Sequence, residues 1–438
     1  MRVLFSSTWG HGHVFPMVPL ARACLAAGHE VLWVTNEPTC RLVAEAGVPV
    51  TAAGLDTQGV REVEVRNRAH LQGLGACVGN ARARNCAPHG ALDVPIDPPV
   101  VPLKGPDQPQ DRAPSPPGVV RKQYRHGVLA PQDWAAFAFP TMFGAWATPG
   151  MATDLLATGR TWRPDLLVHE AAELASPLVG AVLGVPSLTH SFGGAVPPAF
   201  VAEAGERLAP LWAEHGLVVP PYAGTFGAPY LDICPPSVQP VDLSHIPVRQ
   251  PLRPVPWSGP PPLELPSYLR GGDVPLVYLT LGTVNHQAAV LRPAVEALAS
   301  LPVRVLVTLG PDGTADALGS QPSNVTVQQW VSQAQVLKHC DVVVSHAGSG
   351  TFLGALSAGL PQLCLPQAAD QFRNAGAAVR RGAGLVLTAE QASGRAIAEA
   401  VLILLRQPSL RTAAREVATE AAALPGPEQV SALLATLV

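Results

Sequence analysis

Residues 341–372 read DVVVSHAGSGTFLGALSAGLPQLCLPQAADQF, and this stretch decides the class of fold. Residues 341–345 are a β-branched run of the kind that a parallel sheet buries on both faces. A turn of small residues follows at 346–351, and a helix is predicted for 351–358, with Gly359-Leu360-Pro361 as its stop. Free N–H groups at a helix start, together with the helix dipole, bind anions. The turn therefore predicts a phosphate site, most simply for a diphosphate.

Two better-known glycine-rich motifs do not fit this turn, because Gly354 comes one residue late for a dinucleotide fingerprint and no Gly-Lys-Ser/Thr follows for a P-loop. A purely structural turn stays open at this point. His346, at the end of the strand, adds a donor that can reach phosphate. Asp370 and Gln371, after the next strand, offer the carboxylate and amide groups that suit sugar hydroxyls.

The turn at 346–351, together with the segment PQAADQF at 366–372, resembles the donor-site signature of GT-B glycosyltransferases. The family-1 type, and its bacterial antibiotic members acting on calicheamicin-type and macrolide aglycones, are the most similar. The resemblance covers residues 1–55 and 160–438. It implies an α/β fold of two Rossmann-like domains facing each other across a cleft. It also implies a set of donor-binding residues in these two segments: His346, Gly348, Ser349, Gly350, Thr351, Asp370 and Gln371.

The composition agrees with two α/β domains. A chain of 438 residues is too long for one core. A net charge of −3 with 14% charged residues argues against nucleic acid or an anionic membrane as partner. The seven cysteines are scattered and never spaced Cys-x-x-Cys, so neither disulfides nor zinc are predicted. The N-terminus enters a strand without a secretion signal, and no stretch suits a membrane span, so we expect a cytoplasmic protein.

The chain is predicted to divide at a proline-rich stretch, residues 235–266, which is typical of an interdomain linker. A β-α-β pattern opens the first half and implies parallel pairing. The predicted parts are an acceptor-binding Rossmann-like domain at 1–230, a linker at 231–272, an NDP-sugar-binding Rossmann-like domain at 273–420, and a tail helix at 421–438 that in the family crosses back toward the first domain.

Residues 56–130 do not fit this scheme. Neither the helical nor the strand periodicity of apolar residues continues there, and ten prolines lie between positions 88 and 117. The family normally has helices here that help to build the acceptor pocket. One interpretation is an extended or disordered insertion. The other is a local reading-frame error in a GC-rich gene. Resequencing the gene would distinguish the two.

The first turn, Gly12-His13-Val14-Phe15-Pro16, resembles the family's Gly-His-x-x-Pro, whose histidine is the general base on the acceptor hydroxyl. The resemblance assigns this role to His13, and a base with a pKa near neutrality suits it. Such a base needs an orienting carboxylate. Glu170 occupies the family's position after the strand RPDLLVHE, and Glu173 is the alternative. Alternatives stay open for both residues. His11 and His13 could form a turn with a packed imidazole or half of a metal site, and Glu170 could be an ordinary exposed acid or a neighbour of a helix N-cap.

Further donor contacts follow from the resemblance. Thr283 ends the first strand of the second half and can face the same phosphates. Residues 329–333 resemble a Trp-x-x-Gln segment, which places Trp330 under the nucleotide base, or alternatively in the core, and Gln333 near the ribose. No Asp-x-Asp occurs in the chain. Helix-start N–H groups, His346 and Thr283 must then stabilise the leaving diphosphate, so no metal and no cofactor besides the NDP-sugar co-substrate are expected.

These features predict an inverting, metal-independent transfer of a (deoxy)sugar from a dTDP- or UDP-linked donor to a hydroxyl of a hydrophobic natural-product aglycone. The alternative is an inactive, glycosyltransferase-like auxiliary protein or a sugar-nucleotide epimerase of the same fold. A nicotinamide or flavin oxidoreductase, suggested by Gly10-x-Gly12 with Glu37, is disfavoured because Phe15 replaces the third glycine. A homodimer or an auxiliary protein partner stays open.

Overall fold

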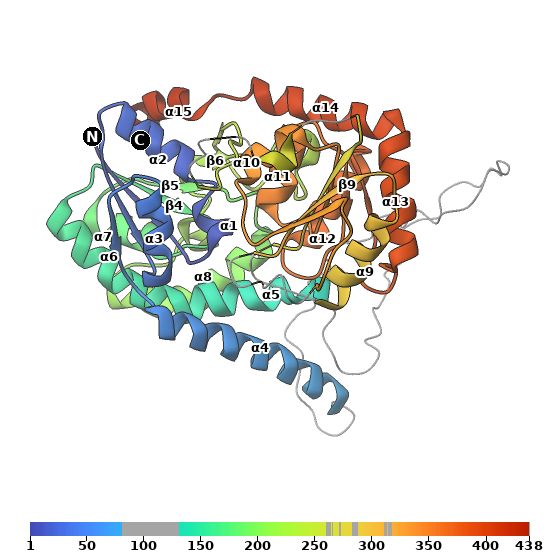
Figure 1. Cartoon of the computed structure of the whole chain (residues 1–438). Coiled ribbons are helices and arrows are strands. Elements are labelled where there is room, and N and C mark those ends of the chain that lie inside the picture. Colours follow the sequence, from blue (N-terminus) through green and yellow to red (C-terminus); the bar gives the residue numbers. More distant parts are fainter. Residues whose placement is uncertain are drawn as a thin grey trace, which may run out of the picture.

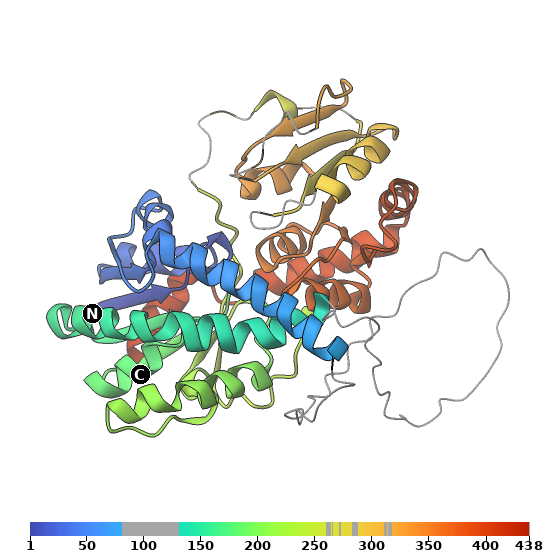
Figure 2. The same ribbon diagram turned by 90° about the horizontal axis from the view of Figure 1, so that it is seen from below.

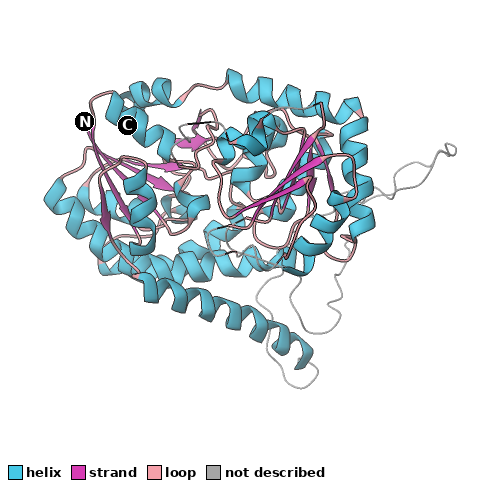
Figure 3. Ribbon diagram, viewed as in Figure 1, coloured by secondary structure: helices cyan, strands magenta, loops and turns pink. Residues whose placement is uncertain are grey.

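The computed structural model describes residues 1–80, 131–259, 264, 266–270, 273–282, 288–310, 313 and 318–437. Its strands form two separate parallel sheets, each with helices packed around it (Figures 1 and 3). Seen from below in Figure 2, the two units stand beside each other. The α/β class with two Rossmann-like domains, predicted from the sequence, is confirmed.

The first sheet has seven strands in the order β3-β2-β1-β4-β5-β6-β7, and the second has six in the order β10-β9-β8-β11-β12-β13. The strands of the first are β1 (Arg2–Ser7), β2 (Glu30–Thr35), β3 (Val50–Ala52), β4 (Leu166–Glu170), β5 (Ser187–His190), β6 (Tyr230–Asp232) and β7 (Arg249–Pro251). Those of the second are β8 (Leu276–Thr280), β9 (Arg304–Thr308), β10 (Val325–Gln328), β11 (Val342–Ser345), β12 (Gln362–Cys364) and β13 (Gly384–Val386).

Helices connect and cover these strands. Around the first sheet they are α1 (His11–Val14), α2 (Val18–Ala26), α3 (Glu37–Glu45), α4 (Thr57–Asn80), α5 (Trp134–Ala138), the π-helix η2 (Phe139–Ala147), α6 (Thr148–Trp162), α7 (Ser176–Leu183) and α8 (Pro198–Glu214). Around the second they are α9 (Ala288–Ala299), α10 (Gln333–Val336), α11 (Ser349–Ser357), α12 (Gln371–Arg381), α13 (Gly394–Arg406), α14 (Pro408–Ala423) and α15 (Pro427–Leu433). Short 3₁₀ turns are η1 (Pro131–Asp133), η3 (Pro221–Gly224), η4 (Pro236–Val238), η5 (Ser267–Leu269), η7 (Leu337–His339) and η8 (Leu434–Thr436).

The strand order places one switch point in each sheet. β1 lies between β2 and β4, and β8 lies between β9 and β11. The chain therefore adds strands first on one side of each central strand and then on the other. In such sheets ligands bind outside the carboxyl ends of the strands at the switch point. The residues that follow β1, β4, β8 and β11 are therefore the ones that the fold exposes to a ligand.

The stretch at 341–372 folds as the strand, turn, helix and strand that it predicts. β8, β11 and β12 are buried along their whole length, as the β-branched run requires. The helix α11 begins at Ser349, two residues earlier than predicted, because Gly348 already takes the extended conformation of an N-cap.

Two sequence predictions are wrong, one about the interdomain linker and one about residues 57–80. The linker predicted at 231–272 contains strand β7 and most of β6, so the first sheet continues to Pro251. The prolines concealed these strands, although an edge strand such as β7 tolerates proline because its outward N–H groups need no partner. Residues 57–80 form the helix α4, where no regular element is predicted. The question of an insertion or a reading-frame error falls on residues 81–130, which lie outside the described residues.

The end of the chain returns to the first sheet (Figure 1). α14 ends at Ala423, slightly beyond the predicted boundary at 420. α15 then packs on α2, with Val430 in the same apolar core as Val18 and the Ser431 hydroxyl 3.5 Å from the Cys24 thiol. No helix in the described part of the chain combines the length and the apolar character needed to cross a membrane.

Candidate active site

His13 and Glu170 meet at the carboxyl ends of β1 and β4. Nδ1 of His13 lies 3.1 Å from Oε1 of Glu170. Glu170 is completely buried and is fixed by two donors: the Thr8 hydroxyl, 3.0 Å from Oε2, and the Ala172 N–H, 2.8 Å from Oε1. The His13 contact lacks the alignment of a regular hydrogen bond, as is common in catalytic pairs before a substrate orders them.

The surroundings raise the pKa of His13. Burial by itself lowers the pKa, but the charge and hydrogen-bonding capacity of Glu170, together with the charge of Asp370, outweigh burial. The imidazole thus has a higher proton affinity than a free histidine. A nitrogen of this kind, with a buried carboxylate behind it, can take a proton from a hydroxyl and hold it.

Glu173, the alternative partner for His13, forms structural hydrogen bonds instead. Its carboxylate accepts a hydrogen bond from the Ser6 hydroxyl at 2.7 Å and from the Ala175 N–H at 2.7 Å, just before α7 begins. The interpretation of Glu170 as an ordinary exposed acid is wrong, because its side chain is fully buried against His13. Among the described residues, no group of three or more His, Cys, Asp or Glu side chains is placed to hold a metal ion.

Aromatic rings surround His13. The rings of Phe143 and Phe192 have centroids 5.4 and 5.1 Å from its imidazole. Phe143 belongs to the π-helix η2 and also contacts Trp9, whose indole N–H donates to Glu64 at 3.0 Å. π-Helical turns occur often at functional sites. Neither phenylalanine was predicted from the sequence. For Phe143 the signal was the concentration of aromatic residues at 134–146 in a chain with only 5% of them; Phe192 had no such signal.

The turn that leads into α11 lies at the carboxyl end of β11. His346 is held between two glycines, and a Cβ atom at Gly282 or Gly348 would overlap its ring. Burial lowers the pKa of His346 to about 4, so the imidazole is neutral at physiological pH and keeps one N–H donor. The N–H groups of the first turn of α11, with Ser349 and Gly350, have no partner within the helix. Thr283 lies outside the described residues.

Asp370 and Gln371 lie beside this turn at the start of α12. Oδ2 of Asp370 accepts from the Ser349 hydroxyl at 2.5 Å and from the Ser349 N–H at 3.2 Å. Oε1 of Gln371 accepts from the N–H groups of Gln367 and Ala368, at 2.8 and 3.0 Å. The glutamine oxygen therefore shapes the loop before α12, which leaves the amide NH₂ as its group for a ligand.

The Trp330 segment reaches the first domain. Trp330 is 42% exposed, so core packing is excluded for it. Its ring lies 5.2 Å from the ring of His11 and 6.4 Å from that of Phe15, centroid to centroid. Gln333, at the start of α10, donates to the Thr351 hydroxyl at 3.0 Å. Gln333, the predicted ribose contact, thus lies against the first turn of α11, whereas Trp330, the predicted base contact, lies against the turn that follows β1.

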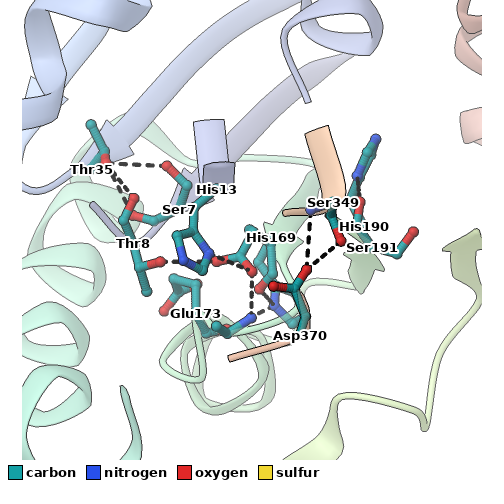
Figure 4. Close-up of polar contacts among 12 residues, drawn as sticks. Ser7, Thr8, His13, Thr35, His169, Glu173, His190, Ser191, Ser349 and Asp370 are labelled. Atoms are coloured by element: carbon teal, nitrogen blue, oxygen red, sulfur yellow. Dashed lines mark hydrogen bonds and ion pairs between the residues drawn. The ribbon is translucent and has the colours of Figure 1, made fainter. Parts of the chain in front are cut away.

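The two halves of the site face each other directly (Figure 4). Figure 4 shows His13 from the first domain in one view with Ser349 and Asp370 from the second. Gly193, in the loop after β5, lies so close to Ser349 that a Cβ atom would overlap the serine hydroxyl. A buried histidine–carboxylate pair on one side and a helix start on the other, at the carboxyl ends of the strands of two Rossmann-like sheets, agree with the arrangement expected of a GT-B glycosyltransferase.

Comparisons with known proteins agree with this class. The model described as the N-terminal domain of "Erythromycin biosynthesis protein CIII-like" proteins matches residues 138–282, and the C-terminal domain model matches residues 292–437. The chain is 30% identical to the L-demethylnoviosyl transferase of Streptomyces niveus over 99% of its length and 98% of the relative's. It is 32% identical to the elloramycin glycosyltransferase ElmGT of Streptomyces olivaceus, covering 100% of this chain and 97% of that one.

Solved structures give the same result. The glycosyltransferase SnogD of Streptomyces nogalater is 26% identical, with a TM-score of 0.70 and coverage of 100% of this chain and 99% of that chain. SsfS6 of Streptomyces sp. SF2575, complexed with thymidine diphosphate, is 25% identical, with a TM-score of 0.72 and the same coverage. The chain therefore belongs to the erythromycin biosynthesis protein CIII-like family of antibiotic glycosyltransferases, within the family-1 type of the GT-B fold.

Proposed function

We propose that this glycosyltransferase moves a (deoxy)sugar from a dTDP-linked, or alternatively UDP-linked, donor to a hydroxyl of a hydrophobic aglycone, with inversion and without a metal ion. The observation that carries the proposal is the contact between His13 and the fully buried Glu170 at 3.1 Å, opposite the start of α11. This pair supplies a base where the second domain presents an anion site.

The reaction is a single displacement. With Nδ1 of His13 facing Glu170, Nε2 is the nitrogen that takes the proton of the acceptor hydroxyl. The hydroxyl oxygen bonds to the anomeric carbon while the bond from that carbon to the diphosphate oxygen breaks. Glu170 stabilises the imidazolium that results. Attack from the face opposite the leaving group inverts the anomeric configuration.

The donor half is assigned to the second domain. N–H groups at the start of α11, near Ser349 and Gly350, and the neutral imidazole of His346 would receive the diphosphate charge as it develops. Asp370 and Gln371 would bind sugar hydroxyls, while Trp330 and Gln333 would contact the base and ribose. A thymidine diphosphate complex of the relative SsfS6 supports a dTDP donor.

The acceptor half is assigned to the aromatic surface around His13. Phe143 and Phe192 offer flat apolar area to an aglycone, with the base between them. The names of two relatives point to acceptors of this kind: an aklavinone 7-beta-L-rhodosaminyltransferase and a 10-deoxymethynolide desosaminyltransferase. A hydrophobic polycyclic or macrolide alcohol fits both observations.

A transfer assay tests the proposal. The purified protein is incubated with dTDP- or UDP-sugars and with aklavinone or 10-deoxymethynolide, and products are identified by mass spectrometry. We expect a glycosylated product whose yield is unchanged by EDTA. Loss of product with EDTA would contradict metal independence. Donor hydrolysis or epimerisation without any transfer would favour the epimerase alternative, and an absence of all turnover would favour the auxiliary protein.

Gly350 gives a test of the diphosphate site. A Cβ atom at this exposed position in α11 would meet no protein atom within 4 Å, so Gly350→Ala should leave the melting temperature unchanged or slightly raised. Once a diphosphate approaches the backbone, the methyl group obstructs it. We expect the Kd for dTDP, measured by calorimetry, to rise about tenfold, equivalent to roughly 1.4 kcal/mol.

Gly150→Ala is the matched control, because Gly150 is an exposed glycine in the first turn of α6, with its nearest contact at an ordinary 3.7 Å. It should leave both the melting temperature and dTDP affinity essentially unchanged. Equal dTDP affinities for the wild type and Gly350→Ala would contradict the placement of the diphosphate at the start of α11.

A further inference from the structure

The side chain of Asn374 joins the two loops of the donor half. It lies one turn into α12 and is only 1% exposed. Its Nδ2 lies 2.9 Å from the carbonyl oxygen of Ala347, 3.0 Å from Oδ2 of Asp370 and 3.2 Å from the Ser349 hydroxyl. One amide group thus contacts the turn before α11 and Asp370, the last residue of the loop before α12.

Both loops contain a strained residue. Ala347 has φ +63° and Ala369 has φ +54°, in the left-handed region that residues other than glycine rarely occupy. Such conformations persist only where the surrounding contacts hold them, and they are frequent at ligand sites. Asn374 supplies one of those contacts directly, at the Ala347 carbonyl, and another one residue beyond Ala369, at Asp370.

The hydrogen bonds also fix the direction of the Asp370 carboxylate. Within the described residues, the Ser349 N–H, the Ser349 hydroxyl and the Asn374 amide all donate to Oδ2, and no hydrogen bond reaches Oδ1. Three donors on one oxygen set the plane of the carboxylate and leave the other oxygen available to a ligand.

We propose that Asn374 is a positioning residue for the transferred sugar: it locks the phosphate turn to the Asp370 carboxylate so that Oδ1 faces the sugar. This rests on the proposed function, in which Asp370 contacts sugar hydroxyls. An amide is required because it donates two N–H bonds. A carboxylate of the same size donates none when ionised and repels Asp370.

The test is the ratio of two dissociation constants, Kd for dTDP-glucose divided by Kd for dTDP, measured by calorimetry at pH 7.5. The ratio isolates the sugar, because both ligands share the nucleotide. In Asn374→Asp we expect the ratio to rise about tenfold, since a displaced carboxylate loses its sugar contact. Loosening of the phosphate turn weakens the binding of both ligands alike and cancels in the ratio. Asp370→Ala should raise the ratio at least as much.

Lowering the pH to 5.5 gives a signature that lost packing would not produce. In Asn374→Asp the introduced carboxyl group takes up a proton readily, because a second negative charge beside Asp370 is disfavoured. This restores one donor, so the ratio should fall back toward the wild-type value. The charge of Asp370 also acts on His13, His346 and Arg373. The wild type, measured at both pH values, corrects for the change in charge of His13, while His346 stays neutral and Arg373 stays charged.

Asn324→Asp is the control for the loss of an amide donor: the Asn324 amide donates to two backbone carbonyls, of Ala299 and Val303 at 3.0 Å each, outside the site. It should leave the ratio unchanged. If Asn374→Asp does not fold, Asn374→Ser, which is too short to reach all three oxygens, replaces it. If the ratio is raised in Asp370→Ala but stays at the wild-type value in the Asn374 variant, the positioning role of Asn374 is overturned. If the ratio is unchanged in both variants, the sugar contact of Asp370 itself is overturned.

Discussion

Replacing His13 by alanine is expected to reduce glycosyl transfer roughly 10³-fold while dTDP affinity stays at the wild-type value. The loss follows from geometry: His13 is the imidazole in contact with the buried Glu170, and the rings of Phe143 and Phe192 pack against it. The donor groups lie in the second domain, so nucleotide binding does not depend on the imidazole. Turnover from steady-state kinetics and dTDP affinity from calorimetry check the two parts.

His11→Ala is the control for this variant. His11 lies two residues earlier on the same short helix, and its ring contacts Phe15 and Trp330. We expect a weaker donor affinity but a turnover close to that of the wild type. Turnover in His13→Ala close to that of the wild type would mean that another group is the base.

The second large effect is expected for Glu170→Gln, which keeps the size of the side chain and removes its charge. Turnover should fall roughly 10²- to 10⁴-fold, because the imidazolium loses its counter-charge and the amide can favour the wrong tautomer. The pH dependence should change as well. A general base must be neutral, so the wild-type rate rises with pH through the pKa of His13, which Glu170 raises.

Without the Glu170 charge, burial lowers the pKa of His13, so the acidic limb of the rate profile moves to lower pH in Glu170→Gln. Glu173→Gln tests the specificity of this shift, because Glu173 holds Ser6 and the residues before α7 rather than His13. Glu173→Gln should lower the melting temperature but leave the acidic limb of the rate profile at its wild-type pH. If the acidic limb stays at the same pH in Glu170→Gln, the pairing of His13 with Glu170 is contradicted.

The arrangement of residues 341–372 could be predicted from the sequence because it is local. Strand, turn, helix and strand follow one another, so spacing alone places a helix start after β11. The choice of Asp370 as a donor contact and the pairing of His13 with Glu170 needed the family resemblance as well. His13 and Glu170 are far apart in the chain, and only the parallel pairing of β1 with β4 brings them together.

Other features could not be predicted because they depend on contacts between distant segments. Asn374 is an ordinary helical asparagine in the sequence, and its role arises from where β11 and α12 place Ala347 and Asp370. The rings of Phe143 and Phe192 approach His13 from two different elements. β7 was concealed by Pro251 and by the prolines that flank it, which an edge strand tolerates.

The central claim is that His13 directs a single displacement at the anomeric carbon. Its most direct test is the anomeric configuration of the product, followed by ¹H NMR while transfer proceeds from a donor of known configuration to the acceptor selected in the transfer assay. Inversion is predicted: a dTDP-α-D-glucose donor would give a β-glucoside with a large axial–axial coupling at the anomeric proton. A product that keeps the donor's configuration would contradict the mechanism.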